Sequence, residues 1–180
     1  MNTSYRNFKT LTSVMLVAGS LVNPRCVAGN QIKVNDTFPE LQKFELEGKV
    51  PDSLKGKVVL VDFCASWCAP CKASFPVMAD LQKRYGDRGF VIIAVSVDEK
   101  RSAIDDFLKK NAVPFTVLRD VKQKLVEAAS VASMPTSFLL DGEGRVRFIH
   151  NGFKGEETRK QYETEIEGLL KSGRPSVAGL

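Results

Sequence analysis

The chain has 180 residues, and its 26 basic and 21 acidic side chains give a net charge of +5. This length predicts one domain. Because 43% of the residues are hydrophobic and 26% are charged, a disordered or collagen-like chain is excluded. Four cysteines are too few for a small scaffold built on disulfides, so their spacing is more informative than their number.

The N-terminal segment, residues 1–28, has the layout of a secretory signal peptide. Its charged side chains are all basic and carry +3 of the net charge. A mostly apolar run from Leu11 to Val22 follows the first charges, and small residues precede a cleavage point after Ala28. The run falls short of the ~20 residues that cross a bilayer. We therefore expect a cleaved leader, with an uncleaved anchor as the alternative.

Residues 29–171 are expected to form the folded domain, and the polar residues 172–180 a flexible tail. Because +3 of the +5 belongs to the leader, the rest of the chain carries only +2. It has no block of basic residues and no interleaving of basic with aromatic residues, so a nucleic-acid partner is not expected. We expect a monomer.

The first predicted elements alternate between strand and helix. An apolar, β-branched run predicts a strand over 58–64, and apolar residues at helical spacing predict a helix over 70–85. A second apolar run predicts a strand over 90–97. Ser102 and Asp105 then have the spacing of a capping box, which predicts the start of a second helix.

The C-terminal half continues the alternation and ends in a hairpin. The predicted elements are a strand over 115–118, a helix capped by Asp120 and ending at Ala129, strands over 136–140 and 145–150 around an Asp-Gly-Glu-Gly turn, and a last helix opened by Thr158. Alternating units that end in an antiparallel hairpin indicate an α/β fold, with a central mixed sheet and helices on both faces.

The strongest chemical signal is the segment Trp67-Cys68-Ala69-Pro70-Cys71, between the first predicted strand and its helix. A cysteine at the start of a helix meets unpaired N–H groups and the positive end of the dipole, which favour a thiolate. Cys68 is thus predicted to be the exposed nucleophile, and Cys71, one turn on, the thiol that resolves a mixed disulfide. Ala69 and Pro70 complete the redox motif, since proline is tolerated in a first helical turn.

Other uses of this cysteine pair are less consistent with the sequence. A zinc site needs a second pair of ligands, but Cys26 and Cys64 are not paired in sequence and His150 is the only histidine. Attachment of a c-type haem needs a histidine after the second cysteine, where Lys72 stands. A purely structural disulfide would close too short a loop to stabilise the fold much. No metal and no other cofactor is expected beside the redox-active disulfide.

Here the sequence resembles the thioredoxin superfamily, and more narrowly its exported TlpA/ResA-type branch. The matching stretches, in family order, are residues 54–63, the segment Ala65-Ser66-Trp67-Cys68-Ala69-Pro70-Cys71-Lys72, Phe75-Pro76, and Met134-Pro135-Thr136 with the strand that follows. The resemblance implies a thioredoxin fold with an N-terminal extension and an inserted segment around residues 91–115. It also implies an extracytoplasmic thiol-disulfide oxidoreductase, often acting in cytochrome c maturation.

The resemblance also suggests how substrates bind. Pro135 falls on the family's cis-proline, which faces the cysteine pair and shapes the substrate groove. Met134 would offer backbone groups to an extended substrate peptide, with Thr136 beside it, and Trp67 would be a partly exposed contact surface. Without the resemblance, Pro135 could simply be a loop proline that precedes a strand, and Met134 an ordinary loop residue.

Asp62 is an acid inside an otherwise apolar strand, which is costly unless it is paired or protonated. In thioredoxin an aspartate matches this position and handles the proton of the second cysteine. Many TlpA-like proteins have asparagine there and a glutamate three residues after the second cysteine, where this chain has Ser74. We infer that Asp62, with a raised pKa, relays the proton of Cys71. The alternative is a carboxylate in water at the strand edge.

Cys64 stands where the family usually has tryptophan. Strand alternation places it on the same face as Asp62. A small buried residue that fills space is the plainer interpretation, because free cysteines are commonly buried and inert. A third redox thiol is the alternative.

The sequence therefore predicts a protein thiol-disulfide oxidoreductase of the periplasm or another extracytoplasmic compartment, whose partners are exported proteins with cysteine pairs. Asp62 favours a reductase, which would need a membrane thiol-disulfide electron donor because the compartment is oxidising. A disulfide oxidase or isomerase is the alternative. A peroxiredoxin-type peroxidase is disfavoured by Ala65, where threonine or serine is expected, and a copper metallochaperone by the lack of a partnering histidine.

Overall fold

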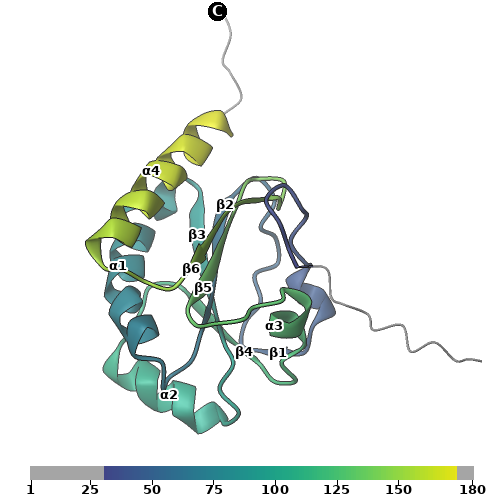
Figure 1. Cartoon of the computed structure of the whole chain (residues 1–180), viewed down its shortest axis with the longest axis vertical. Coiled ribbons are helices and arrows are strands. Elements are labelled where there is room, and N and C mark those ends of the chain that lie inside the picture. The colour runs from purple at the N-terminus through teal and green to yellow at the C-terminus, as the bar shows by residue number, and fades with distance from the viewer. Residues whose placement is uncertain (1–30, 174–180) are drawn as a thin grey trace, which may run out of the picture.

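The computed structural model describes residues 31–173 (Figure 1). One six-stranded sheet has the order β1-β4-β3-β2-β5-β6. Its strands are β1 (Leu46–Glu47), β2 (Val58–Cys64), β3 (Phe90–Ser96), β4 (Thr116–Asp120), β5 (Thr136–Leu140) and β6 (Val146–Asn151). Strands β2, β3 and β4 run parallel, whereas β1, β5 and β6 pair antiparallel to their neighbours. The sheet is mixed, as predicted.

Strand β2 lies at the centre of the sheet, and all seven of its residues are buried. Side chains alternate between the two faces of a strand, so its apolar run contributes to two separate cores. Val58, Leu60 and Cys64 lie in one core, and Val59, Val61 and Phe63 in the other. This alternation places Asp62 on the same face as Cys64, as the sequence predicts.

The helices cover both faces of this sheet. Helices α1 (Ala69–Tyr85) and α4 (Glu156–Ser172) pack on the face that carries Cys64, and α2 (Arg101–Lys110) adds partly buried apolar side chains there. The other face is covered by α3 (Lys124–Ala128) and by the N-terminal extension, in which η1 (Leu41–Lys43) is a single helical turn. Figure 1 shows α1 and α4 on one side of the sheet and α3 on the other.

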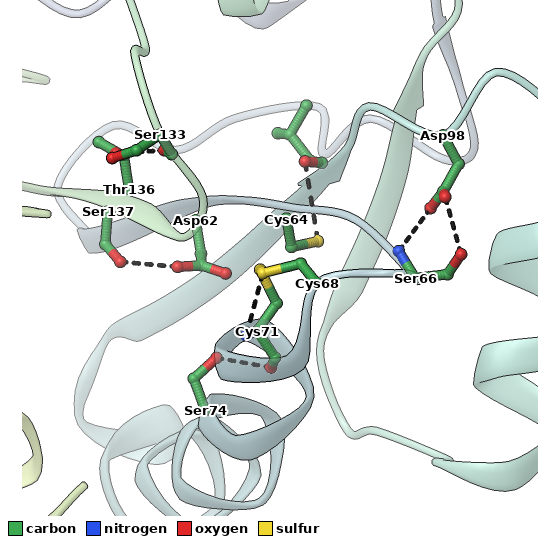
Figure 2. Close-up of a disulfide and its surroundings, with 11 residues drawn as sticks. Asp62, Cys64, Ser66, Cys68, Cys71, Ser74, Asp98, Ser133, Thr136 and Ser137 are labelled. Atoms are coloured by element: carbon green, nitrogen blue, oxygen red, sulfur yellow. Dashed lines mark hydrogen bonds between the residues drawn. A yellow bond between two sulfur atoms is a disulfide. The ribbon is translucent and has the colours of Figure 1, made fainter. Parts of the chain in front are cut away.

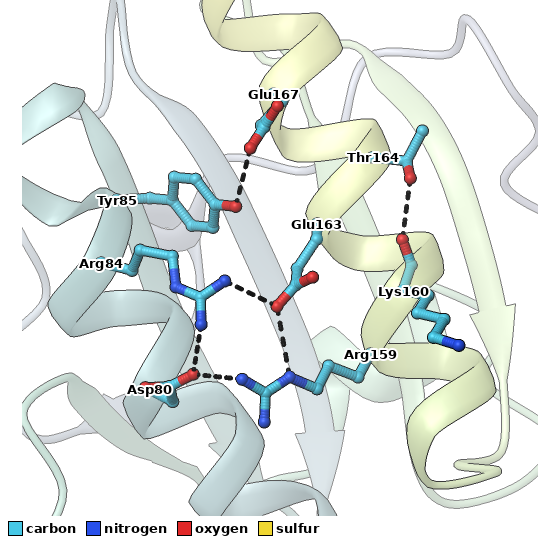
Figure 3. A network of polar contacts seen from close by, with 8 residues as sticks. All are labelled: Asp80, Arg84, Tyr85, Arg159, Lys160, Glu163, Thr164 and Glu167. Carbon is cyan, nitrogen blue, oxygen red and sulfur yellow. Dashed lines mark hydrogen bonds and ion pairs between the residues drawn. The ribbon is translucent and has the colours of Figure 1, made fainter.

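Helices α1 and α4 are also linked by polar contacts at their exposed edge (Figure 3). The guanidinium groups of Arg84 and Arg159 each contact both Asp80 and Glu163, at N···O distances between 2.6 and 3.2 Å. Partly exposed ion pairs contribute only about 0.2–1 kcal/mol each. The apolar contacts beneath them, around Tyr162 and Ile166, therefore contribute most to holding α4 against the sheet.

The predicted N-terminal extension and insertion are both present, but the insertion begins and ends later than residues 91–115. The extension adds β1 to the edge of the sheet beside β4. The insertion comprises α2 and β4, which lie between β3 and α3 in the chain. Val91 does not belong to it, because this residue pairs with Val59 in the central part of the sheet.

The capping box predicted at Ser102 and Asp105 is wrong. Helix α2 begins at Arg101, so Ser102 lies inside its first turn, and Lys100 is the N-cap residue without a side-chain cap. The Asp105 carboxylate instead accepts a hydrogen bond from Nε of Arg101 at 2.8 Å. An ion pair between residues i and i+4 stabilises a helix surface, and here it replaces the reciprocal cap.

The Asp120 prediction is confirmed in its chemistry but not in its position. Asp120 is the last residue of β4, and the short helix α3 begins only at Lys124. Its carboxylate nevertheless accepts hydrogen bonds from the backbone N–H groups of Lys124 and Val126, at 3.1 and 2.9 Å. The acid therefore caps the helix from the end of the preceding strand.

The predicted leader, residues 1–28, and the tail residues 174–180 lie outside the described residues. Helix α4 extends to Ser172, the first residue assigned to the tail. Within residues 31–173, no helix is long and apolar enough to cross a membrane.

Candidate active site

The cysteine pair lies where β2 ends and α1 begins (Figure 2). Cys68 is the N-cap residue of α1 and has an extended backbone, and Pro70 lies in the first helical turn. The two cysteines form a disulfide with a Cα–Cα distance of 5.3 Å. Sγ of Cys68 also accepts a hydrogen bond from the backbone N–H of Cys71 at 3.2 Å. The helix start thus meets the first sulfur with a donor and a positive dipole, as the sequence predicts.

Both cysteines are buried: Cys68 is 5% exposed and Cys71 1%. Cys68 is thus not the exposed residue that the motif predicts. Of the two, however, only Cys68 lines an open groove, so an incoming thiolate reaches Cys68 first. Ser74, one turn further along α1, is buried and donates a hydrogen bond to the carbonyl oxygen of Cys71 at 2.8 Å. This hydroxyl satisfies the helix backbone, in the position where the resemblance leads one to expect a glutamate.

Asp62 is 1% exposed and lies on the sheet face covered by α1 and α4. Its Oδ1 accepts a hydrogen bond from Oγ of Ser137 at 2.6 Å. Its Oδ2 is buried and has no hydrogen-bond partner among the described residues. In Figure 2 this second oxygen points to the side of the disulfide.

Burial raises the pKa of Asp62 from 3.8 to about 7, and the Ser137 hydrogen bond only partly opposes this rise. The cause is the loss of water around a charge, which disfavours the carboxylate. The buried carboxyl that the sequence predicts is therefore present, with a raised pKa. A group with this pKa exchanges its proton near neutral pH, where thiol chemistry needs a base and then an acid.

Cys64 is 1% exposed, and its thiol lies 3.8 Å from the carbonyl oxygen of Val95. Burial, followed by the nearby carboxylates of Asp62 and Asp98, raises its pKa well above the ordinary value. A protonated, enclosed thiol is a poor nucleophile. Its position in the core agrees with the interpretation of Cys64 as a residue that fills space.

Asp98 is a residue of the site that the sequence did not reveal. It is 3% exposed and follows β3. Its carboxylate accepts hydrogen bonds from the backbone N–H and the hydroxyl of Ser66, at 2.9 and 2.7 Å, and from the hydroxyl of Ser96 at 2.7 Å. These contacts hold the loop that leads into the cysteine pair (Figure 2).

A sequence signal for Asp98 did exist. The ends of neighbouring parallel strands meet at one edge of a sheet, and an acid directly after the strand over 90–97 therefore comes close to the end of the strand that carries the cysteine pair. The pairing of Cys64 with Ser96 brings these two strand ends together.

The Met134–Pro135 peptide bond is cis, which confirms the expectation for Pro135. The Pro135 carbonyl accepts a hydrogen bond from the N–H of Gly152 at 2.8 Å. By contrast, the backbone N–H and C=O of Met134 have no hydrogen-bond partner among residues 31–173. Thr136 is buried, and its hydroxyl lies 2.8 Å from the carbonyl oxygen of Ser133, an internal contact.

Trp67 is 70% exposed, which is unusual for a large aromatic side chain. It forms one wall of an open groove of about 510 Å³ beside the disulfide. The groove is lined by Trp67, Cys68, Ala69, Pro70, Val131, Ala132, Ser133 and Met134. The structure therefore brings together the tryptophan, the redox motif and the residue before the cis-proline.

Another pocket of the molecule is separate from this site. It has a volume of about 440 Å³ and opens between the N-terminal extension and the turn after β5, over an apolar floor that includes Val59 and Val61. It contains no cysteine or histidine.

Among residues 31–173, no cluster of three or more histidine, cysteine or acidic side chains is arranged to hold a metal ion.

Known proteins with similar sequences and structures identify the family of this chain. The Redoxin family profile matches residues 33–166. The thiol-disulfide oxidoreductase ResA of Bacillus thuringiensis (strain Al Hakam) is 34% identical over 147 residues, which cover 81% of each chain. ResA of Bacillus subtilis (strain 168) is 37% identical over 123 residues, covering 68% of this chain and 66% of the relative.

Among solved structures, a candidate thiol:disulfide interchange protein DsbE from Chlorobium tepidum is 36% identical, with a TM-score of 0.72. The match covers 78% of this chain and 99% of that one. The sheet order, the cysteine pair at the start of α1 and the cis-proline agree with these similarities. The chain therefore belongs to the Redoxin family, in the TlpA/ResA-type branch of the thioredoxin superfamily, and is a protein thiol-disulfide oxidoreductase.

Proposed function

We propose that this protein works outside the cytoplasm as a reductant of disulfides in exported proteins, with cytochrome c maturation as one pathway it serves. The observation that favours this direction is Asp62, a buried acid at the position where the reductant thioredoxin also has aspartate, with its free oxygen on the side of the disulfide. A base at this place helps the second thiol to attack, which is the step that completes the reduction of a substrate. The apolar run in the leader supports the compartment.

The proposed reaction begins with the reduced protein. The Cys68 thiolate attacks one sulfur of a substrate disulfide, a mixed disulfide forms, and the other substrate sulfur leaves as a thiolate that takes a proton. Asp62 then accepts the proton of Cys71. The resulting thiolate attacks Sγ of Cys68, the mixed disulfide breaks, and the second substrate sulfur leaves as a thiolate that takes the proton back from Asp62. Two electrons have moved to the substrate, and the Cys68–Cys71 disulfide has formed.

The cycle closes when a thiol donor reduces this disulfide again. In an oxidising compartment that donor must draw its electrons from across the membrane, so we expect a membrane thiol-disulfide protein as the electron partner. The electrons are carried by the two cysteines, so we expect no further cofactor. We expect the protein to act as a monomer, because the exposed Trp67 lies beside the disulfide, where a substrate must approach.

The groove beside the disulfide suits an extended peptide. The unpaired backbone groups of Met134 offer one donor and one acceptor, which is what strand addition requires. The Trp67 ring offers apolar surface on the other side of Cys68. Thr136 would act indirectly, through its internal contact with Ser133 at the base of the groove.

The direction of electron flow is tested by equilibrating the purified protein in glutathione buffers and measuring the potential of the cysteine pair. Related sites range from about −270 mV in thioredoxin to about −120 mV in the oxidase DsbA. We expect a value near the thioredoxin end. A value near that of DsbA would overturn the proposed reductase and favour an oxidase.

The roles of the two cysteines are tested by trapping. Cys71→Ala should accumulate mixed disulfides between Cys68 and substrate proteins, because the resolving thiol is gone. Cys68→Ala should accumulate none, because the remaining sulfur, on Cys71, does not line the groove. Comparable trapping by the two variants, read from non-reducing gels, would refute this assignment.

A further inference from the structure

Two hydroxyl groups connect the Asp62 carboxyl to helix α4. Ser137 is the residue of β5 that pairs with Asp62 across the sheet, and its Oγ lies 2.6 Å from Oδ1 of that acid. The hydroxyl of Tyr162, on α4, lies 2.8 Å from the same Oγ. Each of the three residues is at most 2% exposed. The contacts therefore form a linear chain of three polar groups that is buried in the core.

Proton counting gives this chain a direction. An ionised carboxylate only accepts hydrogen bonds, so the single hydroxyl proton of Ser137 points to Asp62. Burial, followed by the nearby Asp62, raises the pKa of Tyr162, so that its hydroxyl keeps its proton. Tyr162 must then donate to Ser137, since the serine proton is already used. The two hydroxyls are aligned as successive donors toward Oδ1.

No other described group supports the charge on Asp62. Its neighbour on β3 is Ala94, which carries no polar side chain. Helix α1 contributes the cysteine pair, and β2 contributes Cys64. Helix α4 contributes Tyr162, and beyond it Glu165, which lies 2.7 Å from Nε2 of His150 on β6. Desolvation and the Ser137 hydrogen bond are accordingly the two influences on the acid.

We propose that Ser137 and Tyr162 are positioning residues, which hold Oδ1 of Asp62 in a hydrogen bond so that Oδ2 is the oxygen that exchanges a proton with Cys71. The inference rests on the role proposed for Asp62 and goes beyond it. Hydrogen bonds to a charged form favour that form, so the two hydroxyls also oppose the effect of burial. They set the pH range in which the acid changes charge.

The hydrogen-bond relay from Tyr162 through Ser137 to Asp62 is tested by titrating the Asp62 carboxyl carbon by NMR. The oxidised protein is used, because its two disulfide cysteines do not titrate. The signal is assigned by its loss in Asp62→Asn. Ser137→Ala should move the midpoint upward by about one pH unit, since one unit corresponds to the loss of a single favourable contact with the charged form. Ser137→Thr keeps a hydroxyl and should restore the midpoint. Tyr162→Phe should move it in the same direction by less.

Tyr85→Phe is the matched control for Tyr162→Phe. Tyr85 is also 2% exposed and also contacts α4, but its hydroxyl lies 3.1 Å from the carboxylate of Glu167 and not beside Ser137 (Figure 3). This control should leave the midpoint unchanged. If Tyr85→Phe moves the midpoint as much as Tyr162→Phe, loosening of α4 is the cause and the relay is refuted. An unmoved midpoint in both Ser137→Ala and Tyr162→Phe also refutes it.

The same variants separate failure of the relay from failure of the proposed function. Their rates of disulfide reduction are measured across pH, beside that of Asp62→Asn. If Asp62→Asn slows the reaction while Ser137→Ala leaves the pH profile in place, only the relay fails. If Asp62→Asn leaves the rate unchanged at every pH, the role proposed for the acid fails first, whatever the hydroxyl variants do.

Discussion

Asp62 and Asp98 are two buried aspartates beside the same cysteine pair, but their oxygens are treated differently. Asp62 is 1% exposed and lies on β2. Asp98 is 3% exposed and lies just after the end of β3, the neighbouring parallel strand. Three hydrogen bonds from Ser66 and Ser96 reach the Asp98 carboxylate. Among residues 31–173, only one hydrogen bond, from Ser137, reaches Asp62, and its second oxygen has none.

The difference shows that burial alone does not make an acid reactive. A buried carboxylate that is surrounded by donors is stable as an anion and serves as a structural anchor. A buried carboxylate with an unused oxygen is destabilised as an anion and therefore takes up protons near neutral pH. Asp98 holds the loop before Cys68, whereas Asp62 is suited to the proton exchange proposed with Cys71. The following predictions test this contrast.

The largest expected effect is a gain in stability on removal of the Asp62 charge. The folded-state pKa of about 7 lies above the ordinary 3.8, so the folded state holds the proton more tightly and loses stability as pH rises between these values. That gap corresponds to about 4 kcal/mol. In urea unfolding of the oxidised protein, Asp62→Asn should be more stable than wild type by up to about 4 kcal/mol at pH 8. Near pH 4 the gain should vanish. A gain independent of pH would contradict this account.

Asp98→Ala should have the opposite sign. The substitution leaves the Ser66 N–H and two hydroxyl groups without their acceptor, and buried hydrogen bonds to a charged group are worth about 1.5–3 kcal/mol each, less what water restores. We expect a loss of about 3 kcal/mol in the free energy of unfolding at pH 7, measured in urea. A loss below about 1 kcal/mol would mean that Asp98 is not the anchor of this loop.

Asp62→Asn should also slow the reaction while it stabilises the fold. General acid–base groups contribute about 100-fold or more to rates. We expect the reduction of a model disulfide to be about 100-fold slower near pH 7 in stopped-flow measurements. Because the raised pKa belongs to this group, the deficit should change around pH 7. A deficit of the same size at every pH would instead indicate a distorted site.

The smallest expected effect comes from Ser66→Ala, which removes one of the three donors to Asp98 and keeps the backbone N–H. The free energy of unfolding should fall by about 1 kcal/mol. Measured beside Asp98→Ala, this variant shows whether the three contacts act together. If Ser66→Ala alone costs as much as Asp98→Ala, the serine hydroxyl rather than the carboxylate is the anchor.

Much of the site was predictable because its parts are close together in the chain. Cys68 and Cys71 are three residues apart, and the helix start that activates them follows directly from the motif. Asp62 was predictable because a charge inside an apolar strand is conspicuous. The cis-proline came from resemblance, since local statistics favour a trans bond.

Ser137 and Tyr162 were not predictable as parts of the site, and Asp98 had only the indirect signal of an acid directly after a strand predicted to lie beside the cysteine pair. Ser137 contacts Asp62 across 75 residues, and Asp98 contacts Ser66 across 32. Serine and tyrosine are common in strands and helices, so nothing marks them until the sheet pairs β5 with β2 and α4 packs above them. The capping box at Ser102 is absent because α2 begins one residue before it, at Arg101, which places Ser102 inside the first turn.

The sequence by itself determined the alternation of strands and helices, the reactive pair and its place at a helix start, because these depend on hydrophobic period and local backbone chemistry. The tertiary structure alone decided which buried acid is saturated with donors and which is not. Hydrogen bonds of this kind join residues from different strands and helices, and their number depends on packing distances that no local pattern encodes. That count separates the anchor, Asp98, from the acid proposed to move the proton, Asp62.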